Sequence, residues 1–287
     1  MKNIKSRAPS TARIAAALAL GLAAQGAEAA IVTLTTADGL GADSFVRGGG
    51  GIDPVSGLEF RNTNYGGSEL AAVKFIRSGI SASGPTISYE NSFTRAAFFR
   101  FDLSGIGGTI TAATLTLGVR TTELGETESV VFNTIADGHA QDAAPADGGW
   151  DESLLTMANS GLREDAAGLI QDVGPLVVPG TPGPATDVTV QFSTLKLVSR
   201  LNADTNGLVT FVINGGPSVD PRGVNFWSKE NTAGGPFPTL RLTVEGDGAP
   251  VPEPGGVALL LLGLAGLGAM RRRQGKGVRA GVTSKGA

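Results

Sequence analysis

The sequence predicts an all-β protein whose main part is a β-sandwich. Apolar residues make up 41% of the chain and charged residues 17%, with 43 glycines and 15 prolines among 287 residues. This composition is too apolar for general disorder and too rich in glycine for a helical bundle. Several short segments also alternate between apolar and polar residues, which is the period of a strand with one buried face.

The alternating segments recur along the middle of the chain, with turn-forming clusters between them. In the clearest one, residues 110–119, apolar side chains fall on one face and mostly threonines on the other. The same pattern occurs at 97–103, 188–192, 209–213 and 240–244. Glycine-rich turns separate these segments, as a sandwich requires. We therefore predict a single jelly-roll-like unit over residues 30–245.

One helix and two loops interrupt the predicted strands. Ser193 can cap a helix that runs to about Ala203, on which three apolar residues share a face. Segments 138–149 and 174–185 are rich in Gly, Pro or Asp and are predicted to be loops. Residues 246–250 are predicted to be a linker.

The first 29 residues have the three parts of a secretory signal peptide. Basic residues come first, an apolar run at 14–24 follows, and Ala27, Glu28 and Ala29 form a small-x-small cleavage pattern. The apolar run is too short to span a membrane. We expect the secretion machinery to remove residues 1–29, so that the mature chain begins near Ala30.

The C-terminal segment combines a Pro-Glu-Pro motif, an apolar run at 255–270 and three arginines. The residues that carry this pattern are Pro252, Glu253, Pro254, Arg271, Arg272 and Arg273. It resembles the PEP-CTERM sorting signal, which an exosortase reads and removes. The resemblance implies that residues 251–273 contain a transient transmembrane helix, because the apolar run is shorter than the ~20 residues of a stable span. A permanent anchor is the alternative, and residues 274–287 are predicted to be a disordered basic tail.

The composition excludes several classes of function. With no Cys and one His, the chain has no disulfide scaffold, no Cys-ligated zinc and no cysteine nucleophile. Residues 30–250 hold 13 Lys and Arg against 24 Asp and Glu, a net charge of −11 that would repel nucleic acid. His139 lies in a loop, and no serine has a nucleophile-elbow setting. We therefore expect a protein that is not an enzyme and binds no nucleic acid.

Five segments stand in a recognisable order along the middle of the chain: ADSFVR at 42–47, NTNYG at 62–66, RFDLS at 100–104, GWDE at 149–152 and FWSKE at 226–230. Together they resemble the DNRLRE domain, also classed as carbohydrate-binding module family 96, over about 38–244. The resemblance implies a β-sandwich of exported bacterial proteins, with alginate-type glycan binding in some members. Those members tend to have a second Trp where this chain has Met157, which can fill a core position.

The candidate ligand-binding residues lie near Trp227. Strand alternation would place Asn225, Trp227 and Lys229 on one outer face, where the indole could stack on a sugar ring. The alternative is an indole packed under a loop or helix. Trp150, which follows two glycines, is expected to be a core residue.

The same alternation predicts a structural ion pair, and two further residues are candidate metal ligands. Glu230 would point inward, where an unpaired carboxylate is costly, and Arg100 is its expected partner. Asp43 and Asn64 are candidate Ca²⁺ ligands, because calcium prefers carboxylate and carbonyl oxygens. No Asp-x-Asp-x-Asp-Gly loop accompanies them, and no other cofactor is expected.

These observations favour an exported, exosortase-processed protein at the cell surface or in the extracellular matrix of a Gram-negative-type bacterium. Its sandwich is predicted to bind an extracellular polysaccharide without catalysis. The alternative is a structural or adhesive matrix protein without a sugar site. A polysaccharide lyase or hydrolase is less favoured, because neighbouring carboxylates in the sequence do not evidently face each other across a cleft.

Overall fold

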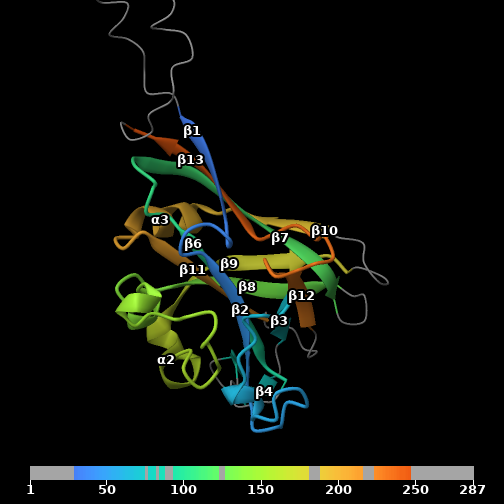
Figure 1. Cartoon of the computed structure of the whole chain (residues 1–287). Coiled ribbons are helices and arrows are strands. Elements are labelled where there is room, and N and C mark those ends of the chain that lie inside the picture. Colours follow the sequence, from blue (N-terminus) through green and yellow to red (C-terminus); the bar gives the residue numbers. More distant parts are fainter. Residues whose placement is uncertain are drawn as a thin grey trace, which may run out of the picture. The chain divides into compact units, whose positions relative to one another are not determined.

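A computed structural model confirms the all-β prediction, and almost all its strands join one antiparallel sheet (Figure 1). It describes residues 29–74, 77–81, 84–87, 93–122, 127–180, 188–215 and 223–246. One half of the sheet contains β1 (Ala30–Thr35), β3 (Leu70–Lys74), β7 (Thr109–Thr122), β10 (Val188–Phe192), β12 (Gly223–Trp227) and β13 (Thr239–Glu245). The other contains β2 (Ala42–Arg47), β6 (Arg95–Asp102), β8 (Glu128–Ile135), β9 (Ile170–Val178) and β11 (Leu208–Gly215).

The strand order makes these halves two layers of one sandwich. The main path runs β1-β13-β7-β12-β3-β6-β11-β8-β9, with β10 paired to β7 and β2 paired to β6. The halves are joined where Lys74 of β3 pairs with Arg95 of β6. A separate hairpin is formed by β4 (Arg77–Ser81) and β5 (Gly84–Ile87).

Aromatic rings from both halves meet in the main core. Phe99 of β6 lies edge-on to Phe226 of β12, with ring centroids 6.3 Å apart. Phe132 of β8 stacks on Phe192 of β10 at 4.4 Å. On β13 the buried positions alternate with accessible ones, as the sequence pattern predicts. Burial of these rings between the layers supplies the main apolar stabilisation of the sandwich.

A second, smaller core covers the outer face of β6 and β11. Phe98 and Val212 alternate with the main-core residues of their strands, so they point to the opposite face. There they pack with Trp150, Met157 and Leu162 from the segment between β8 and β9. This segment contains the 3-10 turns η3 (Ala140–Asp142) and η4 (Pro145–Asp147) and the helix α2 (Leu162–Leu169). Both β6 and β11 are therefore buried on both faces. Trp150 is a core residue as predicted, and Met157 fills a core position.

The predicted helix is present, with its N-terminal cap displaced by one residue. Helix α3 spans Leu195–Ala203, and the hydroxyl of Thr194, not Ser193, accepts a hydrogen bond from the amide of Leu197 at 3.0 Å. Ser193 instead donates to the carbonyl of Ala113, which ties the start of the helix to β7.

Part of the segment predicted as a loop at 174–185 is a strand. Residues 174–178 belong to β9, which bulges against β8 just before Gly174. The bulge and Pro175 are tolerated because β9 is the last strand on its side of the sheet. Helix α2 was not expected, whereas 138–149 consists of turns and the two short 3-10 segments, in agreement with the loop prediction.

The predicted signal peptide, sorting segment and basic tail lie outside the described residues. No helix within the described ranges is long and apolar enough to cross a membrane. The members of both cores fall between Ala42 and Val244. Within the described residues, both cores are thus complete between these two positions, and we expect residues 30–249 to fold by themselves.

Candidate functional site

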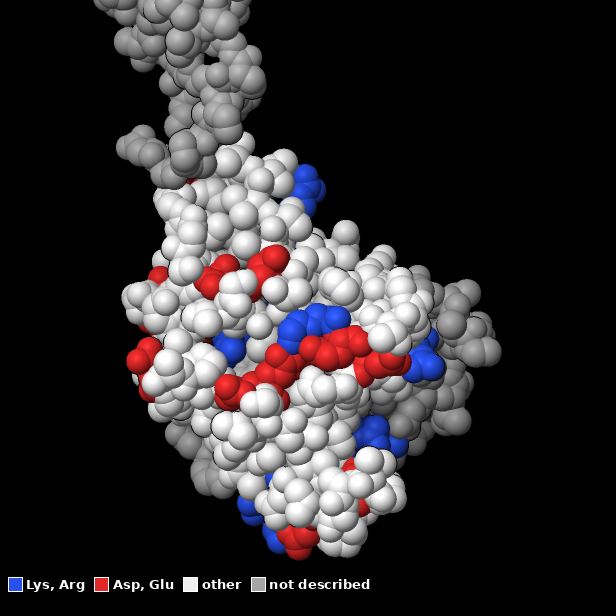
Figure 2. All heavy atoms as spheres, viewed as in Figure 1, with Lys and Arg blue, Asp and Glu red and all other residues white. Residues whose placement is uncertain are grey.

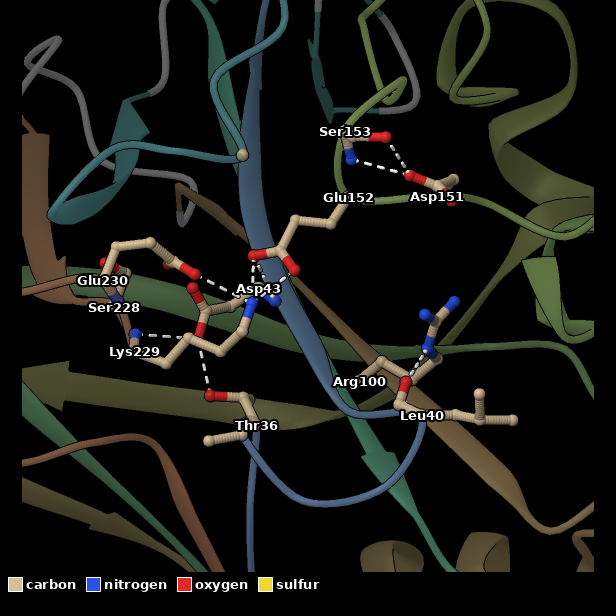
Figure 3. Close-up of polar contacts among 12 residues, drawn as sticks. Thr36, Leu40, Asp43, Arg100, Asp151, Glu152, Ser153, Ser228, Lys229 and Glu230 are labelled. Atoms are coloured by element: carbon tan, nitrogen blue, oxygen red, sulfur yellow. Dashed lines mark hydrogen bonds and ion pairs between the residues drawn. The ribbon is translucent and has the colours of Figure 1, made fainter.

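Three carboxyl groups and an ammonium group meet where β2 passes two loops (Figure 3). Asp43 lies on β2, Glu152 follows η4, and Lys229 and Glu230 follow the end of β12. Oxygen atoms of the three carboxyl groups lie within 4.8 Å of one another. We call Asp43, Glu152, Lys229 and Glu230 the Lys229 cluster.

The ammonium group of Lys229 bonds two of the three carboxylates. Its Nζ donates to both carboxylate oxygens of Glu152 and to Oε1 of Glu230, the latter at 2.8 Å. Burial lowers the pKa of Lys229, but the bonds and charges of its acidic neighbours outweigh that effect and hold the pKa above its ordinary value. Lys229 therefore stays charged at neutral pH.

Asp43 is fully buried at the base of the cluster. Its Oδ2 accepts hydrogen bonds from the hydroxyl of Thr36 at 2.5 Å and from the amide of Lys229 at 3.0 Å. Burial raises the pKa of Asp43 to about 8, and the nearby Glu230 carboxyl contributes to the increase. Among the described residues, neither Asp43 Oδ1 nor Glu230 Oε2 has a hydrogen-bond partner, although both atoms are buried.

A groove of about 430 Å³ opens beside the Lys229 cluster. Polar side chains in its lining include Arg100, Asp151, Glu152, Ser153 and Glu230, and glycines from two loops complete it. Acidic side chains form a band across this face of the molecule (Figure 2). Gly66 permits the close approach of the two loops, because a Cβ there would lie 2.1 Å from the carbonyl oxygen of Glu152.

The predicted ion pair between Arg100 and Glu230 is wrong. The Arg100 guanidinium donates to the carbonyls of Leu40 and Trp150, both at 2.7 Å, and lies 4.5 Å from the Trp150 ring centroid. Glu230 pairs instead with Lys229, its neighbour in sequence. The prediction from strand alternation was wrong because β12 ends at Trp227, and residues beyond the end of a strand do not point to alternate faces.

The expectation of an exposed Trp227 is also wrong. Its side chain is 2% exposed, and the guanidinium of Arg120 lies 5.2 Å from its ring centroid. Gly118 and Gly235 lie so close that a Cβ on either would come within 3.0 Å of the indole. Asn225 is half-buried within the sheet, so the predicted outer face of Asn225, Trp227 and Lys229 is not formed.

Asn64 supports the loop that brings Glu152 to the cluster. Its amide nitrogen donates to the carbonyls of Glu152 and Leu155 at 2.7 and 2.8 Å, and its oxygen accepts from the amide of Gly66. Of the two predicted metal ligands, Asp43 therefore lies among carboxylates, while Asn64 uses its polar atoms to hold the loop. Glu152 was not singled out from the sequence, although it belongs to one of the five ordered segments.

A second acidic group joins the segment after β8 to the end of α3. Asp137, Asp142 and Asp204, which we call the Asp142 cluster, also have oxygen atoms within 4.8 Å of one another. Asn206 donates to Asp142 Oδ2 at 2.8 Å, and Thr205 donates to Asp137. Burial raises the pKa of Asp142 to about 7.

Comparison with known proteins identifies the export route. Residues 250–274 match the PEP-CTERM protein-sorting motif, as the sequence predicted. This motif marks proteins that are exported across the inner membrane of Gram-negative bacteria and sorted by exosortase to the cell surface or extracellular space. No curated protein matches the chain. The match covers the sorting segment and not the sandwich, so membership of the DNRLRE family stays a prediction.

Proposed function

We propose that the exported sandwich is a non-catalytic module that binds an extracellular polysaccharide in the groove beside the Lys229 cluster. The observation that carries the proposal is the convergence of polar side chains on one groove from segments far apart in the sequence. Sugars present closely spaced hydroxyl groups that donate and accept hydrogen bonds. Carboxylate and hydroxyl side chains such as Asp151 and Ser153 complement them.

The charge of the groove favours a neutral polysaccharide. Asp151, Glu152 and Glu230 contribute to its lining, whereas the guanidinium of Arg100 is directed to backbone carbonyls. A uronate-rich chain would bring more negative charge to this surface. The acidic glycan implied by the family resemblance is therefore disfavoured for this chain.

The carboxyl groups of the Lys229 cluster are buried or bonded to Lys229, which supports a role in binding and not in hydrolysis. A glycosidase needs two carboxyl groups that reach the substrate from opposite sides. Asp43 is fully buried, and Glu152 and Glu230 are both bonded to Lys229.

Affinity electrophoresis of residues 30–249 through gels that contain neutral or acidic polysaccharides tests this proposal. We expect a neutral polysaccharide to slow the protein. Gly67→Leu should weaken this effect at least tenfold, because Gly67 lines the groove and its Cβ would point into open space. Gly105→Leu is the matched control, since a Cβ there also meets open space but away from the groove. Equal binding by both variants would place the glycan elsewhere.

A structural or adhesive matrix protein without a sugar site is the second candidate. The burial of Trp150 and Trp227 favours it, because neither indole offers a flat face for a sugar ring. Failure of every neutral and acidic polysaccharide to slow the unmodified protein would support this candidate over the first.

A further inference from the structure

We propose that the Lys229 cluster binds a Ca²⁺ ion between Asp43 and Glu230, with Glu152 as the third carboxylate. The proposal does not depend on glycan binding, and it is tested on the protein alone. It rests on the hydrogen-bond inventory of the cluster and on its charge.

Two buried carboxylate oxygens in this cluster lack a donor. Asp43 is fully buried, and its Oδ1 is unpartnered within the described part of the chain. The same holds for Glu230 Oε2, which comes from a segment 187 residues further along and belongs to the same group of close carboxylates. A buried oxygen of this kind without a partner is costly, because it has lost its water. A positive ligand that both oxygens contact removes this cost.

Lys229 cannot supply the missing donor. An ammonium group has three N–H donors. The three acceptors of Lys229 are the two carboxylate oxygens of Glu152 and Oε1 of Glu230. The donors of Lys229 are thus fully used, and the free oxygens of Asp43 and Glu230 need a different partner.

The charge and the ligand types indicate a divalent cation. With all groups ionised, three carboxylates against one ammonium leave two negative charges inside the cluster. The ligands come from three separate segments, and the groove gives water access to Glu152 and Glu230. Ca²⁺ accepts six to eight oxygens in irregular arrangements, whereas Mg²⁺ demands a near-ideal octahedron. The cluster therefore suits Ca²⁺ better than Mg²⁺.

Calorimetric titration and thermal unfolding of residues 30–249, first treated with a chelator and then supplied with CaCl₂ or MgCl₂, test the proposal. We expect Ca²⁺ to bind with a stoichiometry near one and to raise the unfolding temperature by several degrees, with a smaller effect of Mg²⁺. Glu230→Gln should weaken Ca²⁺ binding at least tenfold. Asp137→Asn is the matched control in the Asp142 cluster and should leave binding unchanged.

A second variant keeps the test informative if removal of one charge affects folding. Asp43→Asn retains an oxygen for Thr36 and the Lys229 amide and adds an N–H group that can donate to Glu230 Oε2. Without Ca²⁺ this variant should unfold at a higher temperature than the unmodified protein. Its unfolding temperature should no longer respond to Ca²⁺.

Two results would overturn the proposal. One is a folded, unmodified protein that shows neither heat of binding nor a thermal shift at millimolar Ca²⁺, which would leave a shared proton between Asp43 and Glu230. The other is binding that survives Glu230→Gln and Asp43→Asn but is lost in Asp137→Asn, which would place the ion in the Asp142 cluster.

Discussion

The Lys229 cluster and the Asp142 cluster bury the same chemical groups in different ways. Each gathers three carboxyl groups, one of which belongs to an almost completely buried aspartate, Asp43 in one cluster and Asp142 in the other. In the first, an ammonium group lies among the carboxylates. In the second, an amide and a hydroxyl supply the hydrogen bonds, from Asn206 and Thr205.

The difference shows two solutions to the cost of a buried carboxyl group. In the Lys229 cluster the ammonium group compensates the charge of Glu152 and Glu230 directly, whereas neutral groups donate to the buried Asp43 and Asp142, and burial raises the pKa of both aspartates. Arg100 is electrostatically coupled to both clusters, because its charge acts on Glu152 and on Asp142. Substitutions of Arg100, Lys229 and Asp142 therefore separate the two solutions.

We expect Arg100→Met to lower the free energy of unfolding most. This change leaves the carbonyls of Leu40 and Trp150 without their donor and removes a buried charge that both clusters share. The free energy of unfolding should fall by about 3–4 kcal/mol, which urea titration of residues 30–249 would measure. Arg100→Lys should recover only part of this loss, since one ammonium does not reproduce the guanidinium fork. A loss below about 1 kcal/mol for Arg100→Met would show that the clusters are stable without it.

Lys229→Met should lower the free energy of unfolding by an intermediate amount, because it disturbs only the Lys229 cluster. With a chelator present, the variant should lose about 2 kcal/mol in the same titration, because Glu152 and Glu230 lose their shared cation. Lys196→Met is the matched control: Lys196 also pairs with a carboxylate, Asp172 at 2.7 Å, but both side chains are largely exposed. It should change stability very little. Equal losses of stability for the two variants would mean that burial of the Lys229 cluster does not strengthen its ion pairs.

Asp142→Asn should change the free energy of unfolding least. At alkaline pH it should raise this free energy, whereas the other two substitutions lower it. The pKa of Asp142 is raised from 3.8 to about 7 in the folded chain, so the folded state binds a proton more tightly than the unfolded state. Its contribution to stability is fully present below pH 3.8 and is lost as pH rises to about 7. Asparagine does not titrate, so the variant should be more stable than the unmodified protein by about 1–2 kcal/mol at pH 8.

Urea titrations of both proteins between pH 4 and pH 8 measure this difference. We expect the advantage of Asp142→Asn to disappear toward pH 4. A variant that is less stable at pH 8 would indicate that the ionised carboxylate has a favourable partner in the Asp142 cluster.

Features encoded by short stretches of sequence were predictable. The alternation at 110–119 and 240–244 defined strands of the sandwich, and helical spacing after Ser193 located α3 to within two residues. The order of Pro252, Glu253, Pro254 and the three arginines indicated the sorting motif. Each of these signals needs only residues that are near one another in the chain.

The site was only partly predictable, because its contacts join distant segments. Asp43 was singled out, but its amide contacts Glu152, 109 residues away, and its carboxylate contacts the Lys229 amide, 186 residues away. Extending strand alternation past Trp227 also misplaced Lys229 and Glu230, since the strand ends there. Nothing local to Arg100 indicated that two backbone carbonyls would be its partners.

The sequence by itself thus determined the strands of the sandwich, the export route and the acidic character of the exported part. The tertiary structure alone decided that Trp227 is covered, that Lys229 neutralises Glu230, and that β6 and β11 are buried on both faces. The physical reason is that periodicity and motif order follow from neighbouring residues. The burial of a side chain and the partner of a charge depend instead on what the rest of the chain packs against it.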